Sequence, residues 1–304
     1  MVIVKNRNIF FAITGAIVLL ALGATLIFGL HLGTDFTGGT LVEFTYPDGR
    51  PAAQAVTDSL SKAGINNVSL REANANDYIL RSPQLNESQR AELPTTLTID
   101  GKPATISQYT EVGPTIGAEL RTKAFLSITL VLLCILLFIA FAFRKVSKPI
   151  SSWVYGVIAL ITLLHDVIIP VGFFALLGHL YGAEVDTLFV TAVLTVLGFS
   201  VHDTIVVFDR VRENLRINQE RGKKEDFEDV AGRSLNQTFV RSINTSMTVV
   251  FTLLVLFLVG PESTHWFALT LLVGIIGGTY SSVALATPLL VVAERWGARG
   301  SKKK

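Results

Sequence analysis

The sequence predicts a polytopic α-helical membrane protein that carries one small α+β domain. Half of its 304 residues are hydrophobic and only 16% are charged, whereas about a quarter of the residues in a soluble domain are charged. The apolar residues also gather into six runs, each close to the roughly 20 residues that cross a hydrocarbon core of about 30 Å. The long polar stretch 31–122 follows the first run and is large enough to bury a core of its own.

The first expected span is the apolar run 9–30. Lys5 and Arg7 precede this run, so a cleaved signal peptide is the competing interpretation. The run is longer than the apolar region of a signal peptide, and no small-x-small cleavage site follows it. We therefore expect an uncleaved span within residues 1–30. The other spans are expected within a helical region, 123–294, at 124–143, 151–177, 187–209, 243–260 and 265–292.

Positive charge is distributed unevenly around these spans. Eighteen of the 26 Lys and Arg residues lie in the segments at one end of the spans, and none lies in the short loops 178–186 and 261–264. Short segments rich in Lys and Arg stay in the cytoplasm. The pattern predicts cytoplasmic termini, a cytoplasmic loop at 210–242, a basic cytoplasmic tail at 295–304, and a position outside the cytoplasm for 31–122.

The polar stretch has the patterns of a small α+β domain. A strand and turn are expected at 39–49, where apolar and polar residues alternate before Pro-Asp-Gly. The other expected elements are a helix at 51–64, short strands at 65–74 and 77–82, a helix around 86–92, and a final strand pair around an Asp-Gly turn within 96–113. Strand, helix, two strands, helix and strand is the order of a split βαβ, or ferredoxin-like, domain.

Few ionisable residues fall inside the expected spans. His165 and Asp166 lie in the third span, His202 and Asp203 lie in the fourth, and Arg241 stands at the entry to the fifth. A carboxylate within a membrane-length apolar run is expensive to bury, so it is a candidate functional residue.

The helical rise gives the depth of Asp203. At 1.5 Å per residue it lies about 10 Å from Arg210 and about 25 Å from Asp186, in the inner half of the membrane. In the fifth span Arg241 begins a polar stripe at helical spacing, which continues through Thr245, Thr248 and Thr252. We expect this stripe to face the fourth span, so that Arg241 reaches toward Asp203.

The favoured interpretation of Asp203 and Arg241 is a proton or ion relay. Desolvation favours a neutral carboxyl and a nearby arginine favours the charged form, so a carboxyl between the two effects can take up and release a proton. Asp166 and His202 are weaker candidates for this relay. The alternative is that Asp203 only hydrogen-bonds a neighbouring helix, that Arg241 is only a cytoplasmic charge, and that Asp166 only shapes a helix break near Pro170.

The sequence lacks the common motifs of nucleotide, metal or covalent chemistry. Segment 33–39, GTDFTGG, lacks the Lys and the Ser or Thr of a phosphate-binding loop, and we expect it to be a hinge. The five histidines have no ligand spacing, and the single cysteine, Cys134, excludes a disulfide within the chain. Gly274 and Gly278 form a GxxxG pattern, which indicates close helix packing. We expect no enzyme activity, no cofactor, no metal and no nucleic-acid binding.

Five segments together resemble a known family. They are GTDFTGG at 33–39, EVGPTIGAELR at 111–121, LLHDVIIPVGFF at 163–174, GFSVHDTIVVFDRVRENLR at 198–216 and SLNQTFVRSINTSMT at 234–248. The resemblance is to the SecF branch of the SecD/SecF family of protein-export membrane proteins, within the resistance-nodulation-division superfamily. It covers nearly the whole chain in order, and its fourth-span motif is the most specific part.

The resemblance implies a multi-pass subunit of the bacterial inner membrane that promotes protein secretion. Such a subunit pairs with a separate SecD chain beside the SecYEG channel and YajC, and uses the proton motive force to draw unfolded secreted polypeptides outward. It implies that Asp203 and Arg241 are the fourth-span aspartate and fifth-span arginine implicated in proton conduction in the family. Thr34 and His202 depart from the family's usual residues. The His202 departure bears on local protonation, so the driving ion, H⁺ or Na⁺, stays open.

Two other functions remain open. A self-contained small-solute exporter of the same superfamily would need to dimerise to complete its membrane part. An intramembrane hydrolase would use Asp166 and Asp203 as paired catalytic carboxylates, but it leaves the polar domain and Arg241 unexplained. We therefore expect a non-enzymatic, ion-driven subunit of the protein-export apparatus.

Overall fold

The computed structural model describes residues 2–144 and 150–301, and the chain divides into two compact units. We call them the helical unit, which comprises 1–31, 126–183 and 188–304, and the α+β unit, which comprises 32–125 and 184–187. The α+β unit therefore includes four residues from a loop far along the chain. Residue 1, residues 145–149 and residues 302–304 of the predicted basic tail lie outside the described residues.

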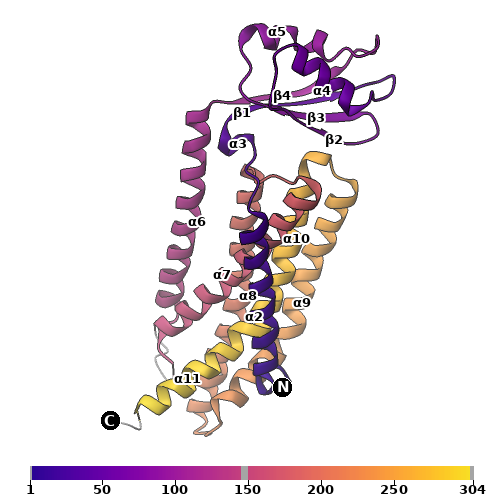
Figure 1. Ribbon diagram of the computed structural model, residues 1–304. Coiled ribbons are helices and arrows are strands. Elements are labelled where there is room, and N and C mark those ends of the chain that lie inside the picture. Colours follow the sequence, from indigo (N-terminus) through magenta and orange to yellow (C-terminus); the bar gives the residue numbers. More distant parts are fainter. Residues whose placement is uncertain (1, 145–149, 302–304) are drawn as a thin grey trace. The chain divides into compact units, whose positions relative to one another are not determined.

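Six helices among the described residues are long and apolar enough to cross a membrane. They are α2 (Arg7–Phe28), α6 (Pro114–Ala142), α7 (Ser152–Tyr181), α8 (Thr187–Glu220), α9 (Phe227–Val259) and the run Ser263–Gly297 (Figure 1). The last run joins α10 (Glu262–Ser281), the π-helix η1 (Ser282–Ala286) and α11 (Thr287–Ser301), while a short helix, α1 (Val2–Lys5), precedes α2. The predicted class, a polytopic helical membrane protein, agrees with these helices.

The segment 210–242, expected as a loop, is mostly helical. Helix α8 continues to Glu220 and α9 begins at Phe227. The polar end of α8 is supported by ion pairs at helical spacing, including Arg210 with Glu213 at 2.6 Å. In the short link, Glu225 accepts hydrogen bonds from Asn218 and from Arg233. The Asn218 hydrogen bond is the main reason that the pKa of Glu225 lies below its ordinary value.

Helix ends in the helical unit are joined by a cluster of charges. Glu228, near the start of α9, binds Arg7 at the start of α2 at 3.4 Å. The same carboxylate binds Arg295 of α11. The beginning of the first apolar helix and the end of the last therefore lie at the same end of the helical unit.

The predicted GxxxG pattern packs α10 against α8. A Cβ added to Gly278 would lie 2.9 Å from Ser200 Cβ, and one added to Gly274 would overlap the Val196 side chain. Both distances are shorter than real Cβ contacts, so a side chain at either position would force the neighbouring atoms to shift. The small residues let the two helices approach, which confirms the packing role read from the sequence.

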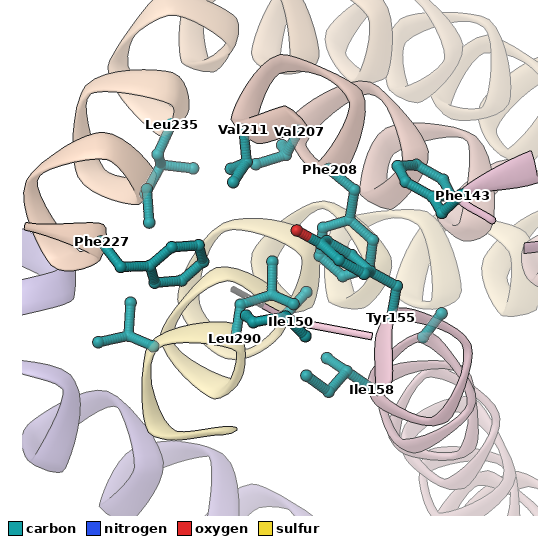
Figure 2. Close-up of a cluster of buried hydrophobic side chains, with 14 of the residues drawn as sticks. Phe143, Ile150, Tyr155, Ile158, Val207, Phe208, Val211, Phe227, Leu235 and Leu290 are labelled. Atoms are coloured by element: carbon teal, nitrogen blue, oxygen red, sulfur yellow. The ribbon is translucent and has the colours of Figure 1, made fainter. Parts of the chain in front are cut away.

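A cluster of buried hydrophobic side chains forms the core of one part of the helical unit (Figure 2). Tyr155 stacks on Phe143, with ring centroids 5.2 Å apart, and meets Phe208 edge-on at 5.3 Å. Phe227 and Leu290 extend this core to α9 and α11. The cluster therefore joins α6, α7, α8, α9 and α11 around aromatic contacts.

The α+β unit has the predicted order of elements: β1 (Gly39–Thr45), α4 (Ala53–Lys62), β2 (Ser69–Glu72), β3 (Asp77–Ser82), α5 (Glu87–Thr96) and β4 (Thr105–Val112). The strands lie in the order β2-β3-β1-β4, and every neighbouring pair is antiparallel. Asn86 caps α5 through a capping box with Gln89. The helix expected around 86–92 is therefore present, and Asn86 caps its start.

The prediction of a final strand pair within 96–113 is wrong for the first of the two strands. Only β4 is a strand, and the Asp-Gly turn holds a single bridge between Ile99 and Lys102. Helix α5 continues to Thr96, which leaves too few residues for a strand before the turn. Pro103 follows Lys102 and has no N–H to extend the pairing.

Two tyrosines anchor the core of the α+β unit. Tyr46 and Tyr78 are fully buried, and their rings meet edge-on with centroids 6.3 Å apart. The Tyr46 hydroxyl donates to the Leu97 carbonyl, and the Tyr78 hydroxyl donates to the Pro51 carbonyl, both at 2.7 Å. Burial raises the pKa of Tyr46 to about 12. The core thus combines apolar packing with satisfied phenol groups.

The segment 33–39, expected as a hinge, contains a short helix, α3 (Thr34–Thr37), and binds the loop 184–187. Gly33 N–H donates to the Val185 carbonyl at 2.8 Å. Asp35 accepts hydrogen bonds from the N–H and the hydroxyl of Thr187, at 3.0 and 2.7 Å. Asp35 therefore caps the first turn of α8 from a distant segment.

Candidate functional site

Asp203 lies inside the helical unit and is bound by hydroxyl groups. Its side chain is buried, with the residue 3% exposed. Ser246 Oγ of α9 donates to Asp203 Oδ2 at 3.4 Å, and Thr279 Oγ1 of α10 lies 2.6 Å from Ser246 Oγ. Ser242, one turn before Ser246 in α9, is also buried, and its hydroxyl has no hydrogen-bond partner among the described residues. Asp203 thus begins a polar network that crosses from α8 through α9 to α10.

Arg241 does not pair with Asp203 in the structure. No ion pair joins these two described side chains, and Arg241 is exposed on α9. Neighbouring residues of a helix point about 100° apart, and the face toward Asp203 is occupied by Ser242 and Ser246. The approach of Arg241 to Asp203 therefore needs a different arrangement from this one.

The threonine stripe predicted to accompany Arg241 faces away from α8. Thr245, Thr248 and Thr252 donate their hydroxyls to carbonyls of their own helix, three or four residues earlier. The stripe facing α8 is made of serines instead. The predicted orientation of α9 was wrong because sequence spacing gives the angle between residues but not which face is buried.

His202, the residue before Asp203, is exposed. Asp203 is buried, so the two side chains leave α8 in different directions, as adjacent helical positions must. The structure therefore separates His202 from the hydroxyl groups that bind Asp203. Its part in a relay stays a prediction.

Asp166 has more hydrogen-bond partners than Asp203. It is fully buried in α7, and its Oδ1 lies 2.7 Å from His165 Nδ1. Its Oδ2 accepts from Ser200 of α8 and from Ser281 of α10, the latter at 2.9 Å. Asp166 is therefore a meeting point of three helices. Its serine partners do not stand out in apolar helices, so from the sequence alone Asp166 is only a weaker candidate.

The two carboxylate networks use neighbouring positions of the same helices. On α8, Ser200 binds Asp166 and stands three residues before Asp203. On α10, Ser281 binds Asp166 and stands two residues after Thr279. Both networks therefore depend on the packing of α8 against α10. The signal that sequence reasoning missed is this set of small hydroxyl residues in apolar spans.

The π-helix η1 begins at the residue after Ser281. Ser282 Oγ donates to the Gly278 carbonyl at 2.5 Å, and Thr287 Oγ1 donates to the Ser282 carbonyl at 3.3 Å. Side-chain hydroxyls thus occupy carbonyls next to the wider turn. Single π-turns inside α-helices are frequent at functional sites, and this one adjoins the residue that binds Asp166.

No group of three or more His, Cys, Asp or Glu side chains is placed to hold a metal ion within residues 2–144 and 150–301. The buried carboxylates have serine and threonine neighbours instead. The chemistry that these groups support directly is the binding and release of a proton by carboxyl and imidazole.

Comparison with known proteins gives the family. Residues 95–296 match the family model described as protein export membrane protein SecD/SecF, C-terminal, and residues 23–46 match the SecD/SecF GG motif. The protein translocase subunit SecF of Thermobaculum terrenum is 43% identical over 95% of this chain and 92% of its own. Those of Anaerolinea thermophila and Pseudomonas aeruginosa are 38% and 34% identical, over 99% and 94% of this chain.

Solved structures agree. The crystal structure of SecDF from Thermus thermophilus, described as a translocon-associated membrane protein, aligns with a TM-score of 0.83 and 30% identity over 96% of this chain. The chain spans 38% of that longer protein. A second SecDF structure, in a super-membrane-facing form, aligns with a TM-score of 0.70. The matched segments include every one on which the sequence resemblance rests, and the chain belongs to the SecD/SecF family of protein-export membrane proteins, as a SecF-type translocase subunit.

Proposed function

We propose that this chain is the ion-driven, non-enzymatic partner of a SecD subunit, and that it uses the proton motive force to promote export of unfolded polypeptides at the SecYEG channel, with YajC. The observation that carries the proposal is the burial of Asp203 of α8 beside hydroxyl groups of α9 and α10. Burying a carboxylate in an apolar span is costly, so such a residue is a functional candidate by default. The relatives are named protein translocase subunits, which supports a role of the chain in protein translocation.

Asp203 is the group that we expect to load and release the ion. Ser246 and Thr279 supply hydroxyls, which can donate or accept and so follow a change in the charge of the carboxyl. Arg241 favours the charged form when it comes near. Moving one charge through the membrane field is worth about 2.3 kcal/mol per 100 mV, which is the energy available for drawing the polypeptide outward.

The proposed topology puts both termini in the cytoplasm of a bacterial cell with the chain in its inner membrane. The joint binding of Arg7 and Arg295 by Glu228 supports it, because it brings the first and last apolar helices together at one end. The excess of Lys and Arg in the short segments of that end gives the direction. Na⁺ in place of H⁺ is the alternative driving ion.

The α+β unit is proposed to lie outside the cytoplasm and to contact the emerging polypeptide together with the corresponding part of SecD. Its strand order, β2-β3-β1-β4, with helices after β1 and β3, supports a ferredoxin-like domain. The proposed boundaries are 31–122, and the compact unit comprises 32–125 together with 184–187.

A self-contained solute exporter is the less favoured function, because the named relatives are translocase subunits. Purification in mild detergent separates the two ideas. We expect a SecD chain to copurify with this chain in equal amount, whereas a self-contained exporter purifies as a homo-oligomer and moves solute by itself in vesicles.

The relay is tested with Asp203→Asn and Arg241→Met in membranes that contain SecD and the channel. Groups that transfer protons typically contribute about 10²-fold or more, so each change should abolish most of the export that depends on the proton motive force. ATP-driven export and copurification with SecD should persist. Glu220→Gln, an exposed change at the polar end of α8, is the matched control. Export at the control level by Asp203→Asn would refute the relay.

A further inference from the structure

His165 has one bound and one unbound ring nitrogen inside the helical unit. The residue is 4% exposed, and its Nδ1 lies 2.7 Å from Asp166 Oδ1. The other nitrogen, Nε2, is buried and has no hydrogen-bond partner among the described residues. A buried polar atom without a partner is uncommon in native proteins, and each one calls for an explanation.

The partners of Asp166 decide which nitrogen of His165 carries the proton. Ser200 and Ser281 donate hydroxyls to Asp166 Oδ2. An ionised carboxylate only accepts hydrogen bonds, and an Asp166 Oδ2 that accepts from both hydroxyls is in the arrangement of the ionised form. The ionised form in turn requires that His165 Nδ1 carries the proton and donates it to Oδ1. Nε2 of the neutral ring is then a bare lone pair.

We propose that His165 is a second proton-accepting group of the helical unit, and that Asp166 is the residue that positions it. A proton from the aqueous phase adds to Nε2, no other bond changes, and the neutral ring becomes an imidazolium that is balanced by the Asp166 carboxylate. Loss of the same proton restores the neutral ring. The inference rests on the proposed function, because the ion gradient supplies the proton.

The surroundings of His165 contain few competing charges. Asp166 on its own helix and Tyr280 of α10 are the titratable groups that contact it, the Tyr280 ring lying inclined by 30° with its centroid 6.4 Å away. Helix α8 contributes Ser200 to this cluster, and α2 contributes Thr14, 3.2 Å from the Tyr280 hydroxyl. Asp166 is therefore the nearest counter-charge for an imidazolium at this position.

The position of the pair also connects it to Asp203. Ser200 and Asp203 are one turn apart on α8, and Ser281 and Thr279 are two residues apart on α10. A change of charge at His165 alters the hydrogen bonds of Ser200 and Ser281, and therefore acts on the two helices that hold Asp203. The two groups then form a pair of proton-binding positions on shared helices.

The first test measures the ring itself. The chain is labelled with ¹⁵N-histidine, reconstituted with SecD in lipid nanodiscs and studied by NMR, with His165→Gln used to assign the signal. We expect the proton on Nδ1 at high pH and a second proton on Nε2 once the pH is lowered. A proton on Nε2 at high pH, or a ring that never changes charge, would overturn the proposal.

The second test separates proton uptake from a purely structural tie. In His165→Asn the side-chain amide nitrogen takes the place of Nδ1 and keeps the hydrogen bond to Asp166, but nothing replaces Nε2. We expect normal insertion and SecD binding, with export driven by the proton motive force reduced about a hundredfold, the lower end of what a proton-transfer group contributes. Export at the unmodified level by His165→Asn would show that the pair is only structural.

Asp203→Asn, measured in the same membranes, distinguishes the two ways to fail. If Asp203→Asn loses export and His165→Asn keeps it, the relay stands and His165 is not part of it. If Asp203→Asn keeps export, the proposed function fails, while the NMR titration still decides whether His165 accepts a proton.

Discussion

Hydroxyl groups supply most of the hydrogen bonds to the two buried carboxylates. Ser246 binds Asp203, while Ser200 and Ser281 bind Asp166. An arginine can only donate, but a hydroxyl can donate to a carboxylate and accept from a carboxylic acid. Hydroxyl partners can therefore stay in place through both protonation states, which suits a group that must load and release a proton repeatedly.

Ser246→Ala tests this role of hydroxyls. The change removes the donor to Asp203 and the link to Thr279, and should lower the free energy of unfolding by about 1 kcal/mol. Export driven by the proton motive force should fall, though less than in Asp203→Asn, because the carboxyl remains. Thr248→Ala, whose hydroxyl serves only the Thr245 carbonyl on an exposed face of α9, is the control. Equal export by the two variants would contradict the role assigned to Ser246.

Tyr46 gives a prediction for pH. Burial raises its pKa from 10.0 in the unfolded chain to about 12, so the folded form holds the phenol proton more tightly. The stability that this contributes is complete below about pH 10 and is lost as the pH rises to about 12. We expect the α+β unit to lose stability over this range, as measured by circular dichroism of the full chain.

Tyr46→Phe removes the titrating group and is the matched variant. Its loss of stability over the same alkaline range should be smaller, although not absent, because burial also raises the pKa of Tyr78 and of Tyr109. The variant should be less stable at neutral pH, since the Leu97 carbonyl loses its donor. An unchanged alkaline dependence in the variant would exclude Tyr46 as its source.

Helix α10 contributes residues both to the close packing against α8 and to the two carboxylate networks. It carries Gly274 and Gly278, which admit α8, and it carries Thr279 and Ser281, which join the two carboxylate networks. The π-turn follows directly. The close approach of α8 and α10 is thus a condition for both proton-binding positions and not a separate feature of packing.

Adjacent glycines of α10 provide a matched pair of changes. A Cβ at Gly278 would lie 2.9 Å from Ser200 Cβ, whereas one at Gly277 would lie 3.7 Å from the nearest atom, at the end of Ile169. Gly278→Ala should therefore cost about 1–3 kcal/mol through overpacking and should reduce export. Gly277→Ala should be close to neutral in both measurements. Similar unfolding temperatures for the two variants would show that α8 and α10 are not tightly packed at Ser200.

At the scale of the whole molecule, apolar patterning predicted the helices and alternation predicted the sheet. The runs longer than about 20 residues gave six spans because length and hydropathy decide membrane crossing. The order of strands and helices followed from alternation and from turn residues such as the Pro-Asp-Gly at 47–49. The helix ends were less accurate, since helices continue past the apolar core: α8 extends to Glu220 through its own ion pairs.

The charged residues of the candidate site could be predicted from the sequence, but the hydroxyl groups that bind them could not. Asp203 and Asp166 stand out because a carboxylate is rare in an apolar span. Ser246 and Ser200 do not stand out, because a serine can satisfy its hydroxyl within its own helix. The rotation of α9 was also beyond sequence spacing, so Arg241 and not Ser242 was expected to face Asp203.

The loop 184–187 makes the α+β unit discontinuous in sequence. A fragment cut at residues 32 and 125 would lose Glu184, the ion-pair partner of Arg81, and Val185, the acceptor of the Gly33 N–H. It would also lose Thr187, leaving Asp35 without the helix start that it caps. A soluble version for binding experiments would therefore need residues 184–187 joined to 32–125 through a designed linker. Two cuts in the sequence do not isolate the complete folded unit.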